Sequence, residues 1–441
     1  MSEREVKVPK KESNSSLKRT KSYFIYLLII LILVDLVDQY STNYINTFPS
    51  LIVQEFLSGY PSKTASSIFA ICVGIASVGM YFVFFNQYFA DKVGRKNMLA
   101  ITTFGMGVAS LLLSLSTNIV MYTIFLFMVY MFFSSDMWLI YINEEAPAER
   151  RATWTDIVLA TGVVGPILIP IFRSMFISET SSNWRAMTLF PILISIPLGI
   201  IILLTVKETS TYEEMKEKAS KEELTVYLKE NVRLLFASPR RKELSILFLM
   251  SFFAGLNYAF ISLGENFIAT NSTNIGQNEI NLIIYSIAFS VITGYLITGV
   301  LADKIGRVPL LYVYSVLLPL SVILTVFGTT FQGGILLLAT LGFSLTYVSY
   351  WGLVLVLRII TVEITPTNKR GTGSGMRAFI NAIGTTVGLF LSGLIVIFFG
   401  QGLSFIFISL PMFIHLPLVY LFIKETKGTD LSFVEYSQET K

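Results

Sequence analysis

The stretch GVLADKIGR, residues Gly299–Arg307, is a short charged turn between two long apolar runs of the sequence. An imperfect copy, QYFADKVGR, occupies residues Gln87–Arg95 in the same setting. A turn that holds an Asp, a Lys and an Arg cannot stay in hydrocarbon, so each copy marks a point where the chain leaves a membrane and soon re-enters it. The Asp residues of the two copies lie 212 positions apart (303 minus 91), which predicts one bundle built twice.

The composition also indicates a membrane protein. Of the 441 residues, 53% are hydrophobic and only 14% are charged, whereas a soluble protein carries about 25% charged residues. The one cysteine, Cys72, and the one histidine, His415, both lie in apolar runs, which argues against a disulfide framework, zinc or haem ligation and Ser-His-Asp chemistry. No GxxxxGK[S/T] phosphate loop is present in the sequence. We therefore expect no enzyme activity, no metal site, no cofactor and no nucleic-acid partner.

Twelve apolar runs are long enough to cross a bilayer, which takes about 20 residues each. The fold class predicted is an all-α membrane protein with two six-helix bundles, at residues 23–206 and 244–424. A charged cytosolic linker at 207–243 joins the bundles, and polar tails occupy 1–22 and 425–441. The expected spans are Tyr23–Ile45, Ser66–Ala90, Met98–Leu115, Ile119–Ile142, Thr155–Ile177, Trp184–Val206, Leu244–Thr270, Ile280–Ala302, Pro309–Thr329, Gly333–Thr361, Gly373–Phe399 and Leu403–Ile423.

Lys and Arg residues gather in alternate connections, and this bias predicts the orientation. The connections on one side hold many cations, whereas the other side holds chiefly Lys63 and Arg185. We therefore place both termini in the cytosol and the protein in the plasma membrane. Asn271-Ser272-Thr273, on the outer side, is an N-glycosylation pattern whose modification is left open. The inner cations are Lys92, Arg95, Lys96, Arg150, Arg151, Lys304, Arg307, Lys369 and Arg370.

Two further motifs repeat at nearly the same offset. EEAPAERR at Glu144–Arg151 matches EITPTNKR at Glu363–Arg370, 219 positions later (363 minus 144). The tripeptide KET at Lys207–Thr209 recurs at Lys424–Thr426, 217 positions later (424 minus 207). Three motifs in one order at nearly one offset indicate a duplicated six-helix unit.

These motifs resemble those of the major facilitator superfamily. The GxxxDxxGR loop between the second and third helices of each half is similar to the signature loop of that family. The ExxPxxxR pattern after each fourth helix, together with Asp35–Asp38 and Asn183–Arg185, resembles its sugar and metabolite:proton symporter branches. Two positions differ, since Val37 stands where those branches often carry Tyr and Gln87 stands where the loop has its first Gly. The resemblance implies two parallel halves with nested inverted repeats and a solute site at the bilayer midplane.

The charges of the repeated motifs are expected at the cytosolic ends of the helices. An Asp–Arg pair can hold a neighbouring helix end, and an acidic group stabilises a helix N-terminus. We predict that these charges gate access from the cytosolic side; the alternative is that they are ordinary loop charges that only set the orientation. The predicted gating residues are Asp91, Arg95, Glu144, Arg151, Asp303, Arg307, Glu363 and Arg370.

Three carboxylates in the expected spans are the candidates for proton coupling, because a charge at membrane depth costs roughly 2–3 kcal/mol or more and is usually functional. Asp35 and Asp38 share one face of the first helix with Gln39, because they are spaced by three and four residues. Two carboxylates within one helical turn cannot both ionise easily in a low dielectric, so we expect one of them to load and release a proton. Asp136 in the fourth helix is a third candidate. The alternative is a static polar pair bonded to backbone or Tyr.

The second half supplies most of the predicted solute-binding residues. The seventh helix carries Ser251, Gly255, Tyr258, Ser262 and Glu265 at helical spacing, and the tenth adds aromatic side chains. The family resemblance implies that helices 1, 4, 7 and 10 line a central cavity. Tyr and Trp beside amides suit sugar-like or other organic solutes, although most aromatic residues here pack against lipid or core. The predicted solute-binding residues are Gln39, Asn257, Tyr258, Ser262, Tyr347, Tyr350, Trp351, Arg377 and Asn381.

The function predicted is secondary active transport by alternating access. We expect proton symport of a sugar, organic acid or similar metabolite by a monomer in the plasma membrane, with solute, protons and lipid bilayer as its partners. One alternative is a proton-coupled drug or metabolite antiporter, since GVVGP at Gly162–Pro166 is similar to an antiporter motif. A second alternative is a membrane receptor that binds a solute without transporting it.

Overall fold

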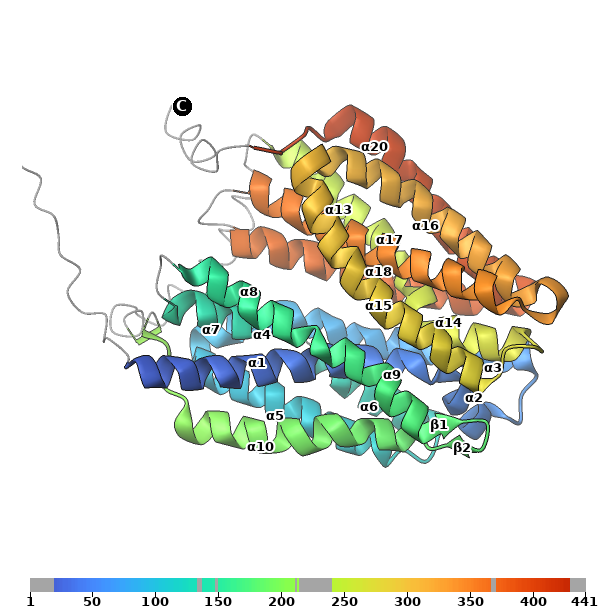
Figure 1. Cartoon of the computed structure of the whole chain (residues 1–441), viewed down its shortest axis with the longest axis horizontal. Coiled ribbons are helices and arrows are strands. Elements are labelled where there is room, and N and C mark those ends of the chain that lie inside the picture. The colour runs from blue at the N-terminus through green and yellow to red at the C-terminus, as the bar shows by residue number, and fades with distance from the viewer. Residues whose placement is uncertain are drawn as a thin grey trace, which may run out of the picture.

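The computed structural model describes residues 20–132, 137–146, 150–210, 212–213, 240–365 and 370–428. Two groups of helices lie against each other, and each contains one half of the chain (Figure 1). The elements of the first half are α1 (Lys21–Asn43), the 3-10 turn η1 (Tyr44–Thr47), α2 (Pro49–Leu57), α3 (Ser62–Ser77), η2 (Val78–Tyr81), α4 (Phe82–Val93), α5 (Arg95–Ser114), α6 (Ile119–Phe132), α7 (Met137–Glu145), α8 (Arg151–Gly162), α9 (Val164–Phe176), β1 (Ile177–Ser178), β2 (Ser181–Ser182), η4 (Trp184–Thr188) and α10 (Leu189–Thr205). The elements of the second half are α13 (Arg241–Leu256), α14 (Tyr258–Asn271), α15 (Gln277–Ile305), α16 (Arg307–Thr330), η5 (Phe331–Gly333), α17 (Leu336–Ile364), α18 (Arg370–Phe399), α19 (Gln401–Ser409), η7 (Leu410–Ile414) and α20 (His415–Phe422).

Twelve helical spans within the described ranges are long and apolar enough to cross a membrane. This confirms the number expected from the sequence, and the spans follow the expected order. Their first residues differ from the expected ones by a few positions; the second span begins at Ser62 and the seventh at Arg241. The side of the membrane on which the termini lie stays a prediction.

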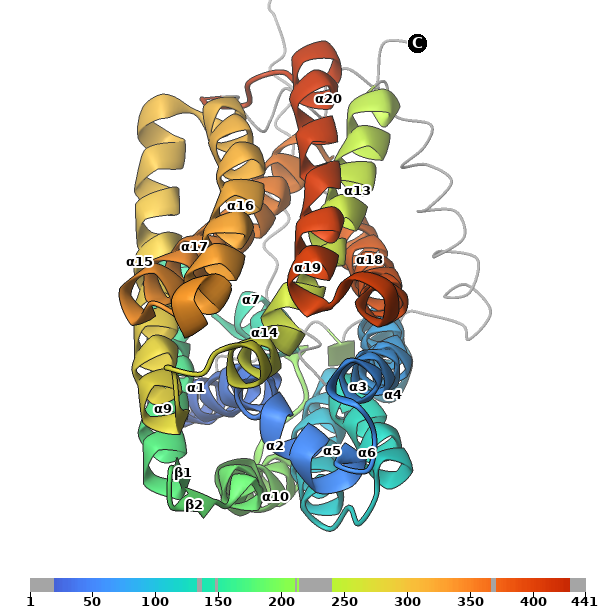
Figure 2. The same ribbon diagram turned by 90° about the vertical axis from the view of Figure 1, so that its right-hand side faces the viewer.

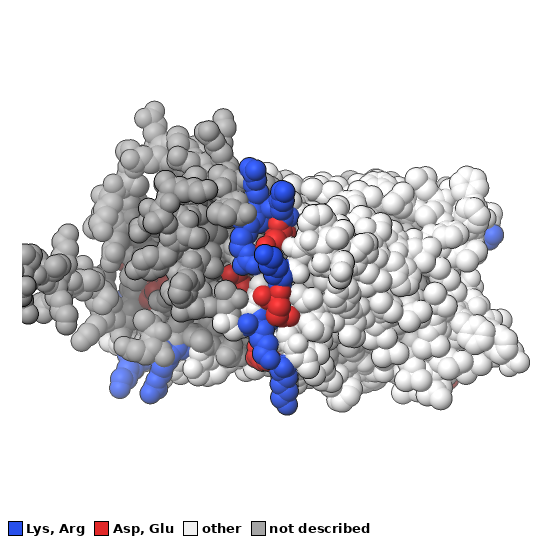
Figure 3. Space-filling view, turned by 90° about the horizontal axis from the view of Figure 1, so that it is seen from above, with Lys and Arg blue, Asp and Glu red and all other residues white. Residues whose placement is uncertain are grey.

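The two ends of the molecule differ in charge. We call the end at which α1 begins and α20 ends the terminal end, and the opposite end, with α2, β1 and β2, the far end (Figure 1). On the face shown in Figure 3, charged side chains gather in a band, and the described surface between this band and the far end is almost free of charge. Exposed apolar side chains such as Phe289, Leu296 and Phe398 are typical of a surface that meets lipid tails.

Several of the helical spans are interrupted in the structure, and two of these breaks lie beside residues of the sites described below. The first span ends in η1, and the short helix α2 follows with Pro49 at its first position, where the fixed φ of proline suits a helix start. The seventh span is divided at Asn257 into α13 and α14. Hydropathy does not show either break, because the residues around both remain mostly apolar.

The two halves are joined along α3 and α18 and at the far end. Ser67 on α3 donates a hydrogen bond to the carbonyl of Gly393 on α18 at 2.7 Å, and the hydroxyls of Ser77 and Thr386 lie 2.7 Å apart. A Cβ at Gly393 would lie 2.7 Å from Ile71, so this close approach requires glycine. Seen from the far end, α14 lies between helices of the two halves, and α9 of the first half runs beside α15 of the second (Figure 2). Toward the terminal end the halves lie further apart (Figure 1).

Candidate functional site

Asp35 is fully buried in α1 and faces α8. Its Oδ1 accepts a hydrogen bond from Gln39 Nε2 at 3.4 Å, one turn along the same helix. A Cβ added to Gly162, the last residue of α8, would overlap Asp35 Oδ2. The absence of a side chain at Gly162 therefore leaves the room that the Asp35 carboxylate occupies.

Asp38 faces a different neighbour of α1. It lines a small cavity of about 20 Å³ enclosed by α1, α5, α6 and α7, together with Thr102 and Thr103. A cavity of this size holds about one water molecule. Asp38 is 6% exposed and Asp35 is 0% exposed, so the structure buries both predicted proton-coupling carboxylates in the first half. Asp136, the third candidate, lies outside the described residues.

The substitution Gly162→Ala is expected to impair proton coupling. The added methyl group would displace the Asp35 carboxylate, and a misplacement of about 1 Å at a reacting group can cost up to about a hundredfold in rate. We expect the initial rate of proton-driven solute uptake to fall by about tenfold or more. Gly59→Ala is the control, because a Cβ at Gly59 meets nothing within 4 Å. Equal uptake by the two variants would show that the position of the Asp35 carboxylate is unimportant.

The stretch Gly162–Pro166 has a packing role in this structure. A Cβ at Gly165 would lie 2.5 Å from the carbonyl oxygen of Leu36 and 3.0 Å from the amide nitrogen of Tyr40. Both glycines thus allow the α8–α9 segment to approach α1 closely. This accounts for the glycines of the antiporter-like motif through helix packing.

An aromatic group joins α14, α15 and α17 in the second half. The ring of Tyr258, at the start of α14, lies 6.1 Å from that of Tyr350 on α17, and Tyr350 lies 5.2 Å from Trp351. Tyr295 on α15, which we did not predict from the sequence, lies 6.1 Å from Trp351. The hydroxyl of Tyr347 donates to the carbonyl of Ile261 on α14 at 3.3 Å. The structure therefore brings together Tyr258, Tyr350 and Trp351 beside the break in the seventh span.

Two of the other predicted solute-binding residues, Asn257 and Asn381, bond backbone carbonyls within the second half. Asn257 donates to the carbonyl of Phe253 at 3.0 Å, at the break of the seventh span. Asn381 on α18 donates to the carbonyl of Ser251 on α13 at 2.9 Å. Ser262 and Arg377 are buried, and Gln39 contacts Asp35 as described above. Solute binding by these residues stays a prediction.

The charged motifs at the terminal end tie together the helix ends of the first half. Arg95, at the start of α5, lies 3.2 Å from a carboxylate oxygen of Glu144 on α7. Thr209, after α10, donates its hydroxyl proton to the other Glu144 oxygen at 2.5 Å. Glu208 accepts a hydrogen bond from the backbone N–H of Lys96 at 3.0 Å, in the first turn of α5.

The second half repeats this arrangement. Arg307 lies 2.8 Å from Glu363 on α17 and 3.3 Å from Asp303, and Thr426 donates its hydroxyl proton to Glu363 at 2.5 Å. Glu425 accepts hydrogen bonds from the backbone N–H groups of Arg307 and Val308 at 2.9 and 3.0 Å. Partial burial opposes ionisation of Glu425, but these two N–H groups together with the backbone N–H groups of Thr426 and Lys427 outweigh it and lower the pKa of its carboxyl.

Each of these ion pairs lies within one half, so none of them bridges the two halves by itself. Their gating role stays a prediction. The repeated KET tripeptide marked the duplication in the sequence, and the structure shows that its Glu and Thr contact the ends of neighbouring helices. The side chains of Asp91, Arg151 and Arg370 lie outside the described part of the chain.

A buried ion pair joins the two halves at the far end, and we did not predict it from the sequence. Arg173 on α9 is 0% exposed, and its Nη2 lies 3.1 Å from Oε1 of Glu265 on α14. Glu265 Oε1 also accepts a hydrogen bond from the Ser50 hydroxyl at 2.6 Å, and its Oε2 accepts one from the Ser50 backbone N–H at 2.7 Å. Ser50 is the second residue of α2, so the Glu265 carboxylate satisfies a free N–H at that helix N-terminus.

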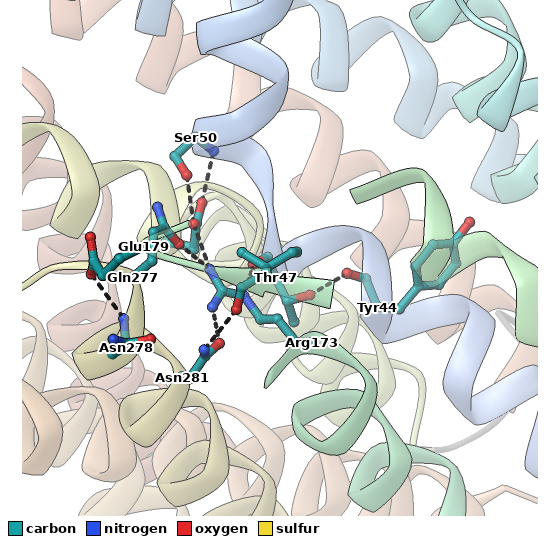
Figure 4. Close-up of polar contacts among 10 residues, drawn as sticks. Tyr44, Thr47, Ser50, Arg173, Glu179, Gln277, Asn278 and Asn281 are labelled. Carbon is teal, nitrogen blue, oxygen red and sulfur yellow. Dashed lines mark hydrogen bonds and ion pairs between the residues drawn. The ribbon is translucent and has the colours of Figure 1, made fainter. Parts of the chain in front are cut away.

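Further bonds complete this cluster. Arg173 Nε donates to the carbonyl of Thr47 at 2.6 Å, Nη2 donates to Gln277 at 2.9 Å, and Nη1 donates to Asn281. Figure 4 shows Thr47, Ser50, Gln277 and Asn281 arranged around Arg173. The rule that ionisable groups in membrane spans are functional would have indicated Arg173 and Glu265, which lie in the fifth and seventh spans. It would not have paired them.

A second charged group anchors α2 within the first half. Arg185 lies 2.7 Å from Glu55 on α2 and donates to the carbonyls of Ser114 and Ser116, and Trp184 Nε1 donates to Glu55 at 2.7 Å. The hydrogen bonds from Arg185 outweigh partial burial and lower the pKa of Glu55. Its ionised form therefore stabilises the fold above the ordinary pKa of a Glu, and this contribution is lost as the pH falls through the lowered value.

Comparison with known proteins agrees with this architecture. The profile of the Major Facilitator Superfamily matches residues 27–357 and 247–438, so the chain belongs to the major facilitator superfamily of secondary transporters. These are transporters and not enzymes.

Similar individual proteins are distant in sequence. A protein of Bacillus subtilis (strain 168) named "Putative niacin/nicotinamide transporter NiaP" is 24% identical over 358 residues, which cover 78% of this chain and 82% of that protein. The crystal structure of a D-xylose-proton symporter has a TM-score of 0.73 at 18% identity and covers 92% of this chain and 99% of the other. An inward-open structure of the xylose transporter XylE from E. coli has a TM-score of 0.71 at 16% identity, covering 94% and 100%. The two structures support the fold.

Proposed function

We propose that this protein is a proton-coupled symporter that carries a small organic solute across the plasma membrane by alternating access. The observation that carries the proposal is the burial of Asp35 and Asp38 on one helix of a two-half bundle that is joined at its far end. Carboxylates inside a membrane span are costly and mark ion or proton pathways. The two halves supply the rocking unit that alternating access needs.

The terminal end is the cytosolic side in this proposal. The Lys and Arg bias of the connections supports this orientation. The far end then faces the outside and is closed in this state. The charged motifs around Arg95 and Arg307 act as cytosolic gates, because they fix the helix ends that must approach each other when that side closes.

The solute binds between the halves, near the break in the seventh span. The rings of Tyr258, Tyr350 and Trp351 offer an organic solute stacking surface, the two Tyr hydroxyls and the indole N–H of Trp351. The similar proteins include one named for niacin and nicotinamide and one named for D-xylose and protons, which supports a small organic solute and proton coupling.

A thermal-shift screen of sugars, organic acids and amino acids at two pH values identifies the solute, and uptake into proteoliposomes then tests the transport mode. With the outside more acidic by one pH unit, symport of one proton per solute is expected to drive about a tenfold accumulation, because a tenfold ratio equals about 1.4 kcal/mol. Accumulation supports symport.

Two other results would contradict the proposal. Extrusion of preloaded solute under the same gradient indicates the proton-coupled antiporter instead. Binding in the thermal-shift screen without flux in either direction, with Asp35 and Asp38 intact, indicates a receptor.

A further inference from the structure

We infer that Arg173 and Ser50 form a carboxylate receptor at the far end, which Glu265 fills in this state and a carboxylate-bearing solute fills when the far end opens. The inference rests on the proposed alternating access and assigns to it a substrate class, an organic acid.

The receptor belongs to one half of the molecule, whereas the carboxylate that fills it belongs to the other. Arg173 and Ser50 lie on α9 and α2 of the first half, and Glu265 lies on α14 of the second. The three hydrogen bonds that the structure describes at the Glu265 carboxylate all come from the first half. Separation of the halves at this end must therefore remove the carboxylate from the receptor.

The first half makes contacts of its own that hold the receptor in position. Arg173 Nε is bonded to the carbonyl of Thr47, in the turn that leads into α2. The ion pair of Glu55 with Arg185 fixes α2 against the start of η4, and both residues are in the first half. We therefore expect the N-terminus of α2 and the Arg173 guanidinium to keep their relative positions when α14 moves away.

The chemistry of the receptor suits a planar carboxylate. Ser50 offers its N–H to one oxygen and its hydroxyl to the other, at 2.7 and 2.6 Å, and Arg173 adds a charged N–H at 3.1 Å. A helix N-terminus and a guanidinium both favour negative charge. Opening also frees the Arg173 N–H groups that now bond Gln277 and Asn281 of the second half. These groups can then take part in a two-point contact with the arriving carboxylate.

The state of the far end controls access to this receptor. Glu265 is attached to the same chain, so it competes with any free carboxylate at a high effective concentration, which is in the millimolar range or above for short tethers. A solute can bind only in the fraction of molecules whose far end is open. Removal of the Glu265 charge is therefore expected to strengthen binding of a free carboxylate.

The test compares benzoate with benzamide, which has the same shape without the charge. Both are titrated calorimetrically at pH 7 into the full-length protein in nanodiscs, as wild type and as Glu265→Gln. We expect Glu265→Gln to bind benzoate at least about tenfold more tightly than the wild type does. Benzamide is expected to bind weakly to both. Unchanged benzoate affinity in Glu265→Gln would overturn the receptor.

Two further variants test whether the bound benzoate lies at Arg173. Glu179→Gln removes another carboxylate that crosses the halves at the far end, where Glu179 accepts from the N–H of Asn278 at 3.2 Å; it is expected to leave benzoate affinity unchanged. The double variant Arg173→Gln with Glu265→Gln lacks the ion pair, as Glu265→Gln does, but it also lacks the Arg173 guanidinium. Benzoate binding should therefore be lost in the double variant. Benzoate binding by this double variant as tight as by Glu265→Gln would place the anion elsewhere and overturn the inference.

A milder variant tests the same contact in case the double variant does not fold. Ser50→Ala in the Glu265→Gln background removes one hydroxyl donor, and we expect benzoate affinity to fall several-fold; no change would count against the receptor.

The receptor and the proposed symport can fail separately. If benzoate binds tightly but no solute is taken up under a proton gradient, the receptor is supported and the proposed symport is contradicted. In the opposite case, wild type, Glu265→Gln and the double variant all take up a neutral sugar at equal rates under a proton gradient. This result would support the proposed symport and would overturn the receptor as a substrate site.

Discussion

Asp35→Asn and Asp38→Asn are each expected to abolish proton-driven accumulation of the solute while exchange at equal pH continues. Asn keeps the size of Asp but cannot gain or lose a proton, so the proton gradient no longer acts on the solute. Under an inward gradient of one pH unit, the accumulation ratio should fall from about ten to about one. Both quantities come from the same proteoliposomes, as net uptake and as solute counterflow.

Ser41→Ala is a matched control for this experiment. Ser41 lies on the same helix, three residues after Asp38, and it is as deeply buried, with 1% of its surface exposed. Its hydroxyl does not change charge at neutral pH, so it cannot store the coupling proton as a carboxylate can. Accumulation should therefore survive Ser41→Ala. If accumulation also survives both Asp substitutions, neither carboxylate of α1 is the proton site.

Arg173→Gln is expected to open the far end. The substitution leaves Glu265 buried without its counter-charge, and breaking a buried ion pair in this way costs about 3–5 kcal/mol. Because this pair forms only when the far end is closed, the cost falls on the closed state. It shifts the ratio of closed to open molecules by about a hundredfold or more, since about 1.4 kcal/mol corresponds to tenfold.

Spin labels on the two halves can measure this opening. Tyr60 and Phe331 are exposed at the far end, at 53% and 44%, and belong to different halves. Cysteines at these two positions, in a background without Cys72, carry the labels for a distance measurement. Arg173→Gln should add a population of molecules with a longer distance between the labels. In the double variant Arg173→Gln with Glu265→Gln this population should be smaller, because no unpaired charge is then left buried.

The control for Arg173→Gln is another arginine at the same end. Arg185 also pairs with a carboxylate, Glu55, at 2.7 Å, but both residues belong to the first half. Arg185→Gln should therefore leave the distance between the labels as in the wild type. The same wild-type distance in Arg173→Gln would show that the Arg173–Glu265 pair does not hold the far end closed.

The candidate site was only partly accessible from the sequence. The sequence indicated Asp35 and Asp38 as candidates because a charge inside an apolar run stands out locally, and the structure buries both. The aromatic residues of the tenth span were found with help from the family resemblance, whereas Tyr295 was not, because nothing in its own segment separates it from the many aromatic residues that pack in the core. The break at Asn257 was also missed, because hydropathy averages over it.

The sequence by itself determined the twelve spans and the duplicated plan of the chain. The spans could be predicted because the free-energy cost of placing charge in hydrocarbon depends only on the composition of each short segment. The duplication could be predicted because the charged motifs GVLADKIGR and QYFADKVGR lie at matching positions in the two halves. Only the tertiary structure decided that Arg173 and Glu265, which are 92 positions apart, share one buried contact. The partner of a buried charge depends on how the helices of the two halves are rotated and how closely they approach. No local pattern in the sequence records it.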